Sequence, residues 1–482
     1  MFIPLTTVLA MAQTAQSPMT EVTVYNQGFG LVKQIRFLDL KKGIQEIPIE
    51  DVAQRIESNS VGIKSLSAPG SFSVLEQNYQ YDLISVAAIL NKAVGQTVTL
   101  RRTFDNGKSE EIKGTLMVAP TNVVSMGEGS QMTYNGLVLK ENGSGRILLN
   151  PTGEVIVDSI PEGLISKPTL KWLLDSDQGG ENKVQLSYLT QGMAWSSDYV
   201  MQLDKDGKMA DLKGWVTLQN NCGTTFKDAK LKLLAGEVNR APGGRAGGAA
   251  NYAAAPMQAR KAKADMVEES FAEYHLYTLD RATTIRNNEQ KQVSLLETFR
   301  IPCKKRILFD PMRDYWGWRP QAEGEVGSGV LHGLVSVQFT NDKKSQMGMP
   351  LPAGNIKVFM NDASGSTQLV GEDRIEHTPK DEKVSLNVGR AFDVVGERKR
   401  TEFEWIRRGN NIVGARETFT TELRNRKESP EEVTLWERYW GEWQVAKSTE
   451  KFTKLDANTA EVVVTLKPNE VRKITYTFEV RW

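Results

Sequence analysis

Lys473-Ile-Thr-Tyr-Thr-Phe-Glu-Val-Arg-Trp482 is the stretch that shows most clearly how this chain of 482 residues folds. Apolar side chains occupy every second position, namely Ile474, Tyr476, Phe478, Val480 and Trp482. Successive side chains of a strand point to opposite faces, so this alternation predicts a β-strand with one buried and one wet face. Residues 462–466 predict a preceding strand, with the turn at Lys467-Pro468-Asn469-Glu470.

The same period of two recurs through the chain, whereas helical patterns are scarce. Apolar residues around Asn26-Gln27-Gly28 predict an N-terminal hairpin. Asp82 is placed to cap a short helix over 83–93, with Gly95 near its C-terminal end, and 257–273 is a weaker helical candidate. Strands separated by turns favour sandwiches and small barrels over a doubly wound sheet.

One local pattern, an alternating strand that ends in asparagine, occurs three times. The strands are 216–220, 335–341 and 419–425, and their return strands are 229–233, 356–360 and 433–436. Asparagine tolerates turn conformations and bonds nearby backbone, so it suits a strand exit. We interpret the three repeats as strand pairs within immunoglobulin-like sandwich units.

These patterns predict an all-β protein with several β-sandwich (immunoglobulin-like) modules, a small β-barrel-like module and few short helices. The expected segments are a signal peptide at 1–17, an N-terminal β module with a short helix at 18–94, a small barrel-like β module at 95–165, a β-sandwich region at 166–395 and a C-terminal β-sandwich at 396–482. A Gly/Ala-rich insertion at 241–264 should be mobile, because its side chains bury too little surface to offset the entropy of ordering.

Charge and the N-terminal residues bear on location and partners. Sixty basic and 59 acidic residues leave a net charge of +1, which disfavours nucleic acid as a partner. A short apolar run precedes Ala10-Met11-Ala12, which matches the cleavage region of a secretory signal. No later stretch approaches the ~20 apolar residues of a transmembrane span. We therefore expect a periplasmic or secreted protein.

The sequence shows no established catalytic, metal or cofactor motif. It lacks the glycine-rich phosphate loop, the dinucleotide fingerprint and the serine nucleophile elbow. His275, His332 and His377 do not have the spacing of a zinc site. Cys222 and Cys303 form no CxxC pair, and they are either one disulfide or two unpaired buried thiols. We predict no catalytic residue, no metal ligand and no cofactor.

The best candidate for binding is the aromatic loop within Phe309–Arg319. Tyr315, Trp316, Trp318 and Arg319 combine rings with a cation, as sugar-stacking or protein-anchoring surfaces do. The alternative is that these rings fill the core between modules. A second cluster allows the same two interpretations: Trp436, Tyr439, Trp440 and Trp443.

Several phrases, in order along the chain, resemble the bacterial "domain of unknown function 4139" family. They are Val24-Tyr-Asn26, Val74-Leu-Glu-Gln-Asn78, Gly192-Met-Ala-Trp195, Leu212-Lys-Gly-Trp215, Asn220-Asn-Cys-Gly223, Leu233-Leu-Ala-Gly236, Leu351-Pro-Ala-Gly354, Gly371-Glu-Asp373, Ala391-Phe-Asp393 and Asn425-Arg-Lys427. The resemblance covers the chain from about Glu21. It implies a β-rich fold and, through relatives labelled "mucoidy inhibitor", a connection with the cell envelope. It implies no catalytic residue, and this chain lacks the coiled-coil segment of those relatives.

These observations predict an exported, non-enzymatic binding or interaction protein whose partner is an envelope protein or a polysaccharide. One alternative is an envelope glycan hydrolase or lyase, which needs two carboxylates roughly 5–10 Å apart. A second alternative is a structural spacer.

Overall fold

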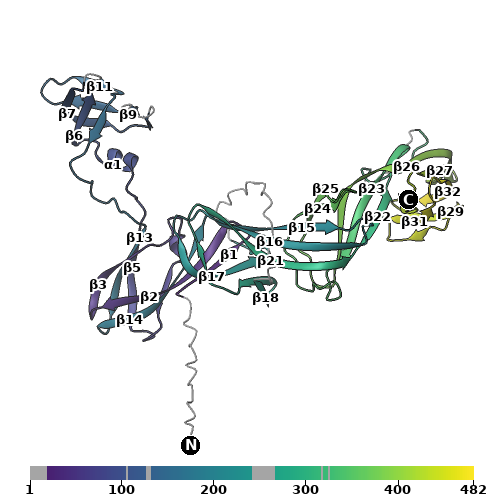
Figure 1. The fold of residues 1–482 in the computed structure, drawn as a ribbon, viewed down its shortest axis with the longest axis horizontal. Coiled ribbons are helices and arrows are strands. Elements are labelled where there is room, and N and C mark those ends of the chain that lie inside the picture. The colour runs from purple at the N-terminus through teal and green to yellow at the C-terminus, as the bar shows by residue number, and fades with distance from the viewer. Residues whose placement is uncertain (1–18, 105–106, 126–131, 241–265, 316–318, 324–325) are drawn as a thin grey trace, which may run out of the picture. The chain divides into compact units, whose positions relative to one another are not determined.

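The protein is built almost entirely of β-strands. A computed structural model describes residues 19–104, 107–125, 132–240, 266–315, 319–323 and 326–482. These residues form many strands in several sheets but only one α-helix (Figure 1). The predicted all-β class is confirmed. The expected signal peptide, and the insertion at 241–264, lie outside the described residues.

The chain divides into two compact units, neither of which is continuous in sequence. The first comprises Met1–Ala194, Gln219–Lys232 and Ala282–Glu289, and the second comprises Trp195–Leu218, Leu233–Arg281 and Gln290–Trp482. The consecutive modules expected from the sequence are a finer division than these two units, and their bounds stay a prediction.

In the first unit, a large sheet contains strands in the order β17–β1–β2–β14–β4, and a smaller one has the order β3–β13–β5. Their bounds are β1 Thr20–Tyr25, β2 Phe29–Leu40, β3 Gly43–Glu50, β4 Gly62–Ser65, β5 Phe72–Gln80, β13 Thr169–Ser176, β14 Gly180–Gln191 and β17 Phe226–Ala235. The predicted N-terminal hairpin is confirmed: β1 and β2 pair antiparallel, and Gly28 in their turn has φ +88°, which favours glycine.

The expected barrel-like module is an open sheet with the order β11–β10–β7–β6–β12. Its strands are β6 Thr97–Thr103, β7 Ser109–Val118, β10 Val138–Glu141, β11 Ile147–Leu149 and β12 Glu154–Ile156. The edge strands β11 and β12 do not pair with each other, so this sheet does not close into a barrel. Leu90 and Ala93 join the core of this sheet, with Leu100, Leu116 and Leu139. A short hairpin, β8 Asn122–Ser125 with β9 Met132–Asn135, lies nearby in sequence.

The one α-helix among the described residues, α1 (Val86–Lys92), begins later than the sequence predicts. Leu83 forms a parallel bridge with Ile165, which holds the backbone before the helix extended. Ser85 therefore caps the helix by accepting from the amide of Ala88, and Asp82 is not the cap. The second helical candidate is wrong over its described part, where β18 (Met266–Phe271) pairs with β19 (Tyr274–Leu279).

The second unit contains a five-stranded and a nine-stranded sheet. The five-stranded sheet has the order β21–β16–β15–β24–β25, and the nine-stranded sheet has the order β29–β32–β27–β26–β23–β22–β28–β31–β30. The first set is β15 Met193–Leu203, β16 Met209–Asn220, β21 Glu289–Pro302, β24 Gly354–Asn361 and β25 Thr367–Ile375. The second set is β22 Lys304–Phe309, β23 Gly329–Thr340, β26 Lys383–Arg408, β27 Asn411–Asn425, β28 Glu431–Arg438, β29 Glu442–Ser448, β30 Thr453–Lys454, β31 Thr459–Leu466 and β32 Val471–Arg481. β26 runs without a break through the expected boundary at 395/396.

The nine-stranded sheet packs its two halves around one core, as in a β-sandwich. Ile474, Tyr476, Phe478 and Val480 are fully buried, as their alternation predicts. They share this core with Leu435 and Val462 from the other half of the sheet. β31 and β32 follow each other in sequence, yet they are not hydrogen-bonded neighbours. They face each other across the core, so burial of apolar side chains holds the halves together.

The three asparagines that end the repeated strands are buried, and they bind loop carbonyls. Asn425 Nδ2 donates to the carbonyls of Ser429 at 2.9 Å, Leu466 at 3.4 Å and Lys467 at 3.0 Å. Its Oδ1 accepts from the amide of Lys427 at 3.0 Å. Because a buried carbonyl without a partner is costly, this one side chain stabilises two loop segments.

Asn220 and Asn341 repeat this arrangement. Asn220 donates to the carbonyls of Thr224, Ile285 and Arg286 and accepts from the amide of Cys222. Asn341 donates to the carbonyls of Met349 and Pro379 and accepts from the amide of Gly348. The strands on either side of each asparagine are not paired with each other, so the predicted strand pairs are wrong. The asparagine marks the point where the chain leaves one strand for a non-adjacent one.

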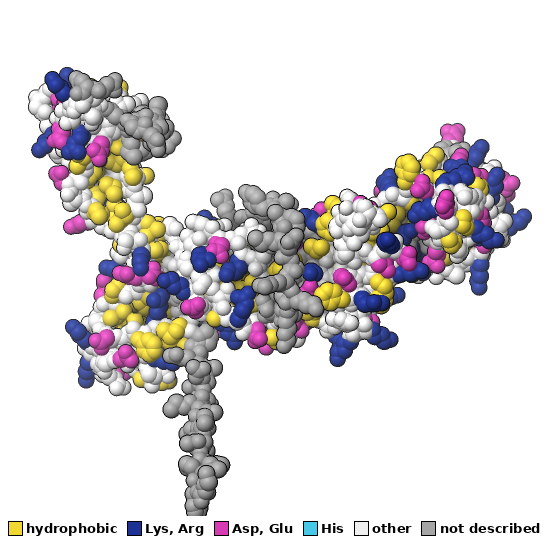
Figure 2. Space-filling view, viewed as in Figure 1, with side chains coloured by type: hydrophobic (Ala, Val, Ile, Leu, Met, Phe, Trp, Pro, Cys, Tyr) yellow, Lys and Arg dark blue, Asp and Glu magenta, His cyan; other side chains and the backbone are white. Residues whose placement is uncertain are grey.

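Both cysteines are free thiols, so the disulfide is excluded; Cys222 is buried as the alternative expected, whereas Cys303 is only half-buried. Burial raises the pKa of Cys222 to about 11 and that of Cys303 to about 12, so both remain protonated near neutral pH. On the visible face, basic and acidic side chains are interspersed (Figure 2). No helix in the described ranges has the length and apolar character needed to cross a membrane.

Candidate functional site

The aromatic loop predicted from the sequence joins β22 to β23 in the second unit. Tyr315 is 44% exposed. Arg319 is also exposed, and its guanidinium lies over the indole ring of Trp482, 5.6 Å from the ring centroid. Trp316 and Trp318 lie outside the described residues. The structure therefore joins Arg319 to a tryptophan that the sequence did not connect with this loop.

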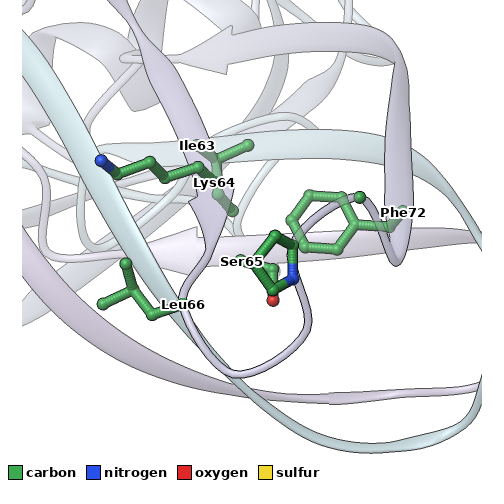
Figure 3. A pocket seen from close by; sticks show the side chains of 7 residues that line it. Ile63, Lys64, Ser65, Leu66 and Phe72 are labelled. Atoms are coloured by element: carbon green, nitrogen blue, oxygen red, sulfur yellow. The ribbon is translucent and has the colours of Figure 1, made fainter.

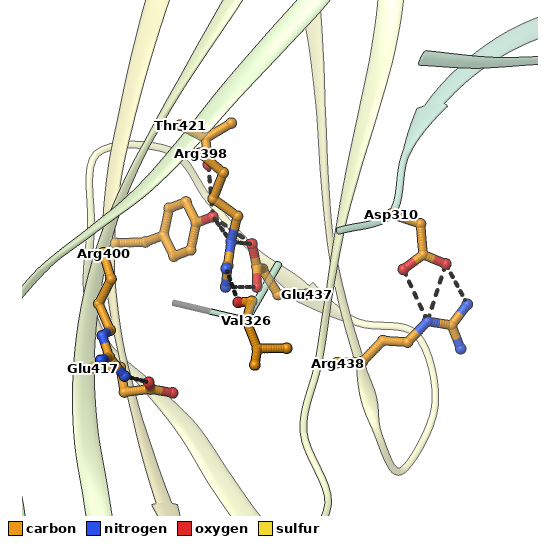
Figure 4. Close-up of polar contacts among 9 residues, drawn as sticks. Asp310, Val326, Arg398, Arg400, Glu417, Thr421, Glu437 and Arg438 are labelled. Carbon is orange, nitrogen blue, oxygen red and sulfur yellow. Dashed lines mark hydrogen bonds and ion pairs between the residues drawn. The ribbon is translucent and has the colours of Figure 1, made fainter. Parts of the chain in front are cut away.

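The first end of the loop is fixed by an ion pair. Arg438, at the end of β28, binds both carboxylate oxygens of Asp310, with Nη2 2.8 Å from Oδ2 and Nε 3.2 Å from Oδ1 (Figure 4). The Asp310 side chain is almost fully buried, as are Pro311 and Met312. A bidentate pair fixes the orientation of both groups, so the chain leaves β22 in a defined direction.

The second end of the loop is held through its backbone. Arg400 donates to the carbonyls of Gln321 at 2.7 Å and Ala322 at 2.9 Å. Arg398 donates to the carbonyl of Val326 at 3.2 Å (Figure 4). Both arginines belong to β26, so the rigid sheet clamps the loop at this end.

Arg398 itself is part of a buried network. Its guanidinium pairs with Glu437, Nε to Oε1 at 2.9 Å and Nη2 to Oε2 at 2.8 Å, and the two side chains are 1% and 0% exposed. Tyr476 donates its hydroxyl hydrogen to Glu437, and the hydroxyls of Tyr476 and Thr421 lie 2.8 Å apart. Burial raises the pKa of Tyr476, and the nearby Glu437 carboxylate raises it further, so the phenol stays a donor.

Glu417 is the second carboxylate of this region, and it pairs with Arg400 at 2.9 Å. It is 6% exposed. Burial raises its pKa, and this outweighs the hydrogen bond and charge of Arg400, which lower it. Glu417 and Glu437 are thus buried carboxylates, each paired with an arginine. A substrate in solution does not reach either one, and their chemistry here is to position Arg398 and Arg400.

Replacing Glu417 with glutamine should remove part of the pH dependence of stability. The folded-state pKa of Glu417 lies above its ordinary value of 4.5, so its stabilising contribution is full below that value and is lost as pH rises through the raised pKa. The free energy of unfolding of the wild type should therefore fall, relative to that of Glu417→Gln, over the pH range that starts at 4.5 and extends through the raised pKa. Urea unfolding across this range measures it. Glu404→Gln, at an exposed position, is the control and should follow the wild type; parallel curves for Glu417→Gln and wild type would contradict the prediction.

Three other aromatic residues extend the site beyond the sequence prediction. Phe403 and Trp405 of β26 pack edge to face at 4.7 Å, and Trp405 packs against Trp482 at 6.4 Å. The guanidinium of Arg400 lies 4.9 Å from the Phe403 ring centroid. We call Phe403, Trp405 and Trp482 the aromatic strip, with Arg400 at one end and Arg319 at the other. Phe403 and Trp405 alternate along their strand, which is the signal that could have revealed them.

Phe392, also missed, is 92% exposed. It lies where the register between β23 and β26 shifts, so that Ala391 and Val394 are buried while Phe392 points to solvent. Such a shift is visible only in the pairing of two strands that are distant in sequence.

The second predicted cluster divides between core and surface. Tyr439 is in the core, and its buried hydroxyl has no hydrogen-bond partner within the described part of the chain. Trp436 is half-buried between the guanidiniums of Arg306 and Arg438, 5.3 and 5.1 Å from its ring centroid. Trp443 donates to the carbonyl of Ala457 and packs against the core.

The three histidines have separate surroundings. His275 Nδ1 lies 2.8 Å from Glu268, and His377 Nδ1 accepts from the amide of Ala353. His332 is exposed on β23. Across the ranges that the structure describes, no group of three or more histidine, cysteine, aspartate or glutamate side chains is arranged to hold a metal ion.

No known family model matches this chain. No curated protein matches it significantly either. The resemblance to the domain of unknown function 4139 family thus stays a prediction from the order of its motifs.

Proposed function

We propose that this is an exported, non-enzymatic interaction protein of the cell envelope, and that it binds an acidic surface of a partner protein through Tyr315 and Arg319. One observation carries the proposal. Arg319 is exposed and stacked on Trp482, yet it makes no ion pair or hydrogen bond with the described residues. As far as the described residues go, its N–H groups are unpaired and can bind carboxylates of a partner.

The described ends of the loop are held in place, and this supports the proposed function. Asp310 with Arg438 holds one end, and Arg398 and Arg400 hold the other. Binding residues commonly lie on loops that a rigid scaffold positions. Residues that are already held in place lose less entropy on binding, so more of their contact energy appears as affinity.

The types of residue favour a protein partner. Tyrosine, tryptophan and arginine dominate the residues whose removal weakens protein interfaces most. Here an exposed tyrosine, a partly exposed tryptophan and a free arginine belong to one loop and the strand end that it contacts. The small-x-small site at Ala10-Met11-Ala12 supports an envelope location, in the periplasm or outside the cell.

Capture of partners from an envelope extract tests the proposal. Arg319→Ala and Tyr315→Ala should each lower capture by at least about tenfold, which corresponds to a loss of roughly 1.4 kcal/mol. Wild-type capture should also weaken as salt rises, because exposed charges are screened.

Phe271→Ala and Arg408→Ala are matched controls, because both residues are exposed and lie away from this loop in sequence. Unchanged capture by Arg319→Ala and Tyr315→Ala, or equal losses in the controls, would refute the role of the loop. If the protein still captures a ligand after the extract has been digested with protease, that ligand is a polysaccharide and not a protein.

A further inference from the structure

β5 is an unusual edge strand in the first unit. It pairs with β13 on one side, and no described strand pairs with its other side. Residues 73–78 are exposed along its length. A register shift between Val74 and Glu76 leaves Leu75 unpaired, so that Val74 and Leu75 are 43% and 49% exposed. Alternate N–H and C=O groups of such a strand point outward without a partner in the sheet.

Proteins usually guard edge strands by making them short, by charged side chains, by proline or by a β-bulge. The opposite edge of the same sheet, β3, carries Pro48 together with Glu46 and Glu50. The edges β18, β21, β25 and β29 each carry at least two charged side chains. The edges β4, β11, β12 and β30 have four residues or fewer. β5 has nine residues, one charge at Glu76 and no proline.

A pocket lies beside the start of this strand. It has a volume of about 470 Å³, and its lining includes Ile63, Leu66 and Phe72, with Lys64 as its only charged residue (Figure 3). The ammonium group of Lys64 points away from Phe72. Lys64 is exposed and makes no ion pair or hydrogen bond with any residue that the structure describes. Apolar side chains beside one cation, in a lining that also has polar surface, suit an apolar side chain next to a carboxylate.

We propose that β5 accepts an extended peptide segment of a partner protein as an added strand. Main-chain hydrogen bonds to β5 would supply affinity, while the pocket and Lys64 would select an apolar and an acidic side chain. Among the described edges, β5 combines more than four residues with a single charge and no proline, and the register shift at Leu75 is its one guard. These features and the adjoining pocket distinguish β5 from the other described edges. This surface is separate in sequence from Tyr315 and Arg319, so it adds a second binding surface to the proposed function.

A labelled ten-residue peptide that alternates valine with threonine and carries one aspartate is a suitable probe, with fluorescence anisotropy on the full chain as the measurement. Saturable binding is expected. Methylating alternate peptide nitrogens should weaken binding at least about tenfold, because these nitrogens can no longer donate to the edge. Val74→Lys should weaken it by a similar factor, since charge guards an edge. Ile44→Lys, on the guarded edge β3, is the matched control and should bind as the wild type does.

Charge reversal tests the role of Lys64. Lys64→Glu should weaken binding of the aspartate peptide, and a peptide with lysine in place of aspartate should regain it. Three results would overturn the proposal. The methylated peptide could bind as tightly as the unmethylated one, Val74→Lys and Ile44→Lys could lose the same affinity, or the peptide could show no saturable binding. Sedimentation that shows wild-type dimers and Val74→Lys monomers would assign the edge to a second copy of this chain and overturn the peptide proposal.

Discussion

Replacing Glu437 with leucine is expected to lower the free energy of unfolding by about 3–5 kcal/mol, the largest effect of any single change considered for this protein. The pair of Arg398 and Glu437 is 1% and 0% exposed. Without Glu437, the buried guanidinium keeps its positive charge, because arginine does not lose its proton in proteins. Tyr476 also loses the acceptor for its hydroxyl. Urea unfolding of the purified chain measures the change.

The double variant Arg398→Met/Glu437→Leu distinguishes two contributions to the free energy of unfolding. One is the cost of leaving Arg398 without its partner, and the other is the net contribution of the ion pair. Two apolar side chains replace two charges that had to be removed from water, so the double variant should regain most of the lost stability. Glu432→Leu is the matched control, because Glu432 lies on the same strand and forms an exposed pair with Lys304. It should cost less than about 1 kcal/mol. A double variant as unstable as Glu437→Leu would show that the network stabilises the fold by another route.

Replacing Asn425 with alanine is expected to cost about 3 kcal/mol. The change removes the amide that binds the carbonyls of Ser429, Leu466 and Lys467, and it leaves these groups and the amide of Lys427 without their partner. Asn355→Ala is the control, because Asn355 is exposed on β24 and should change stability by less than about 0.5 kcal/mol. Urea midpoints compare the two variants.

Asn425→Asp replaces the amide with a carboxyl group of nearly the same shape, so it tests the role of the amide hydrogens. Its carboxylate would face three carbonyl oxygens, so the folded state should hold it protonated and its pKa should rise above the ordinary value. This variant should therefore lose stability as pH rises through that raised pKa, whereas Asn425→Ala should show no such extra dependence. Equal stability of wild type and Asn425→Ala would mean that water replaces the amide.

The strands of this fold were predictable because their cause is local. Alternation along 473–482 follows from one buried face and is visible in the residues themselves. Strand partners are not local: β31 and β32 are adjacent in sequence but lie on opposite sides of a core. The predicted start of the helix was wrong for the same reason. Leu83 bridges to Ile165, which is distant in sequence, so the helix begins only after it.

The candidate site was predictable only as a loop with aromatic residues. Its exposed members, Tyr315 and Arg319, were identified from composition. The clamp could not be foreseen, since Asp310 and Arg438 are 128 residues apart and only the β22–β28 pairing brings them together. The repeated asparagines were noticed as strand ends, but their buried amides bind carbonyls from segments up to 66 residues away.

By itself, the sequence determined which residues alternate between water and core, and hence that the protein is made of strands with few helices. Only the tertiary structure decided which strands pair, which edge stays weakly guarded, where the loop is clamped and which charges are buried. The physical reason is that alternation is set by the geometry of a single strand. Pairing and burial depend instead on the combined free energy of contacts between segments that are far apart along the chain.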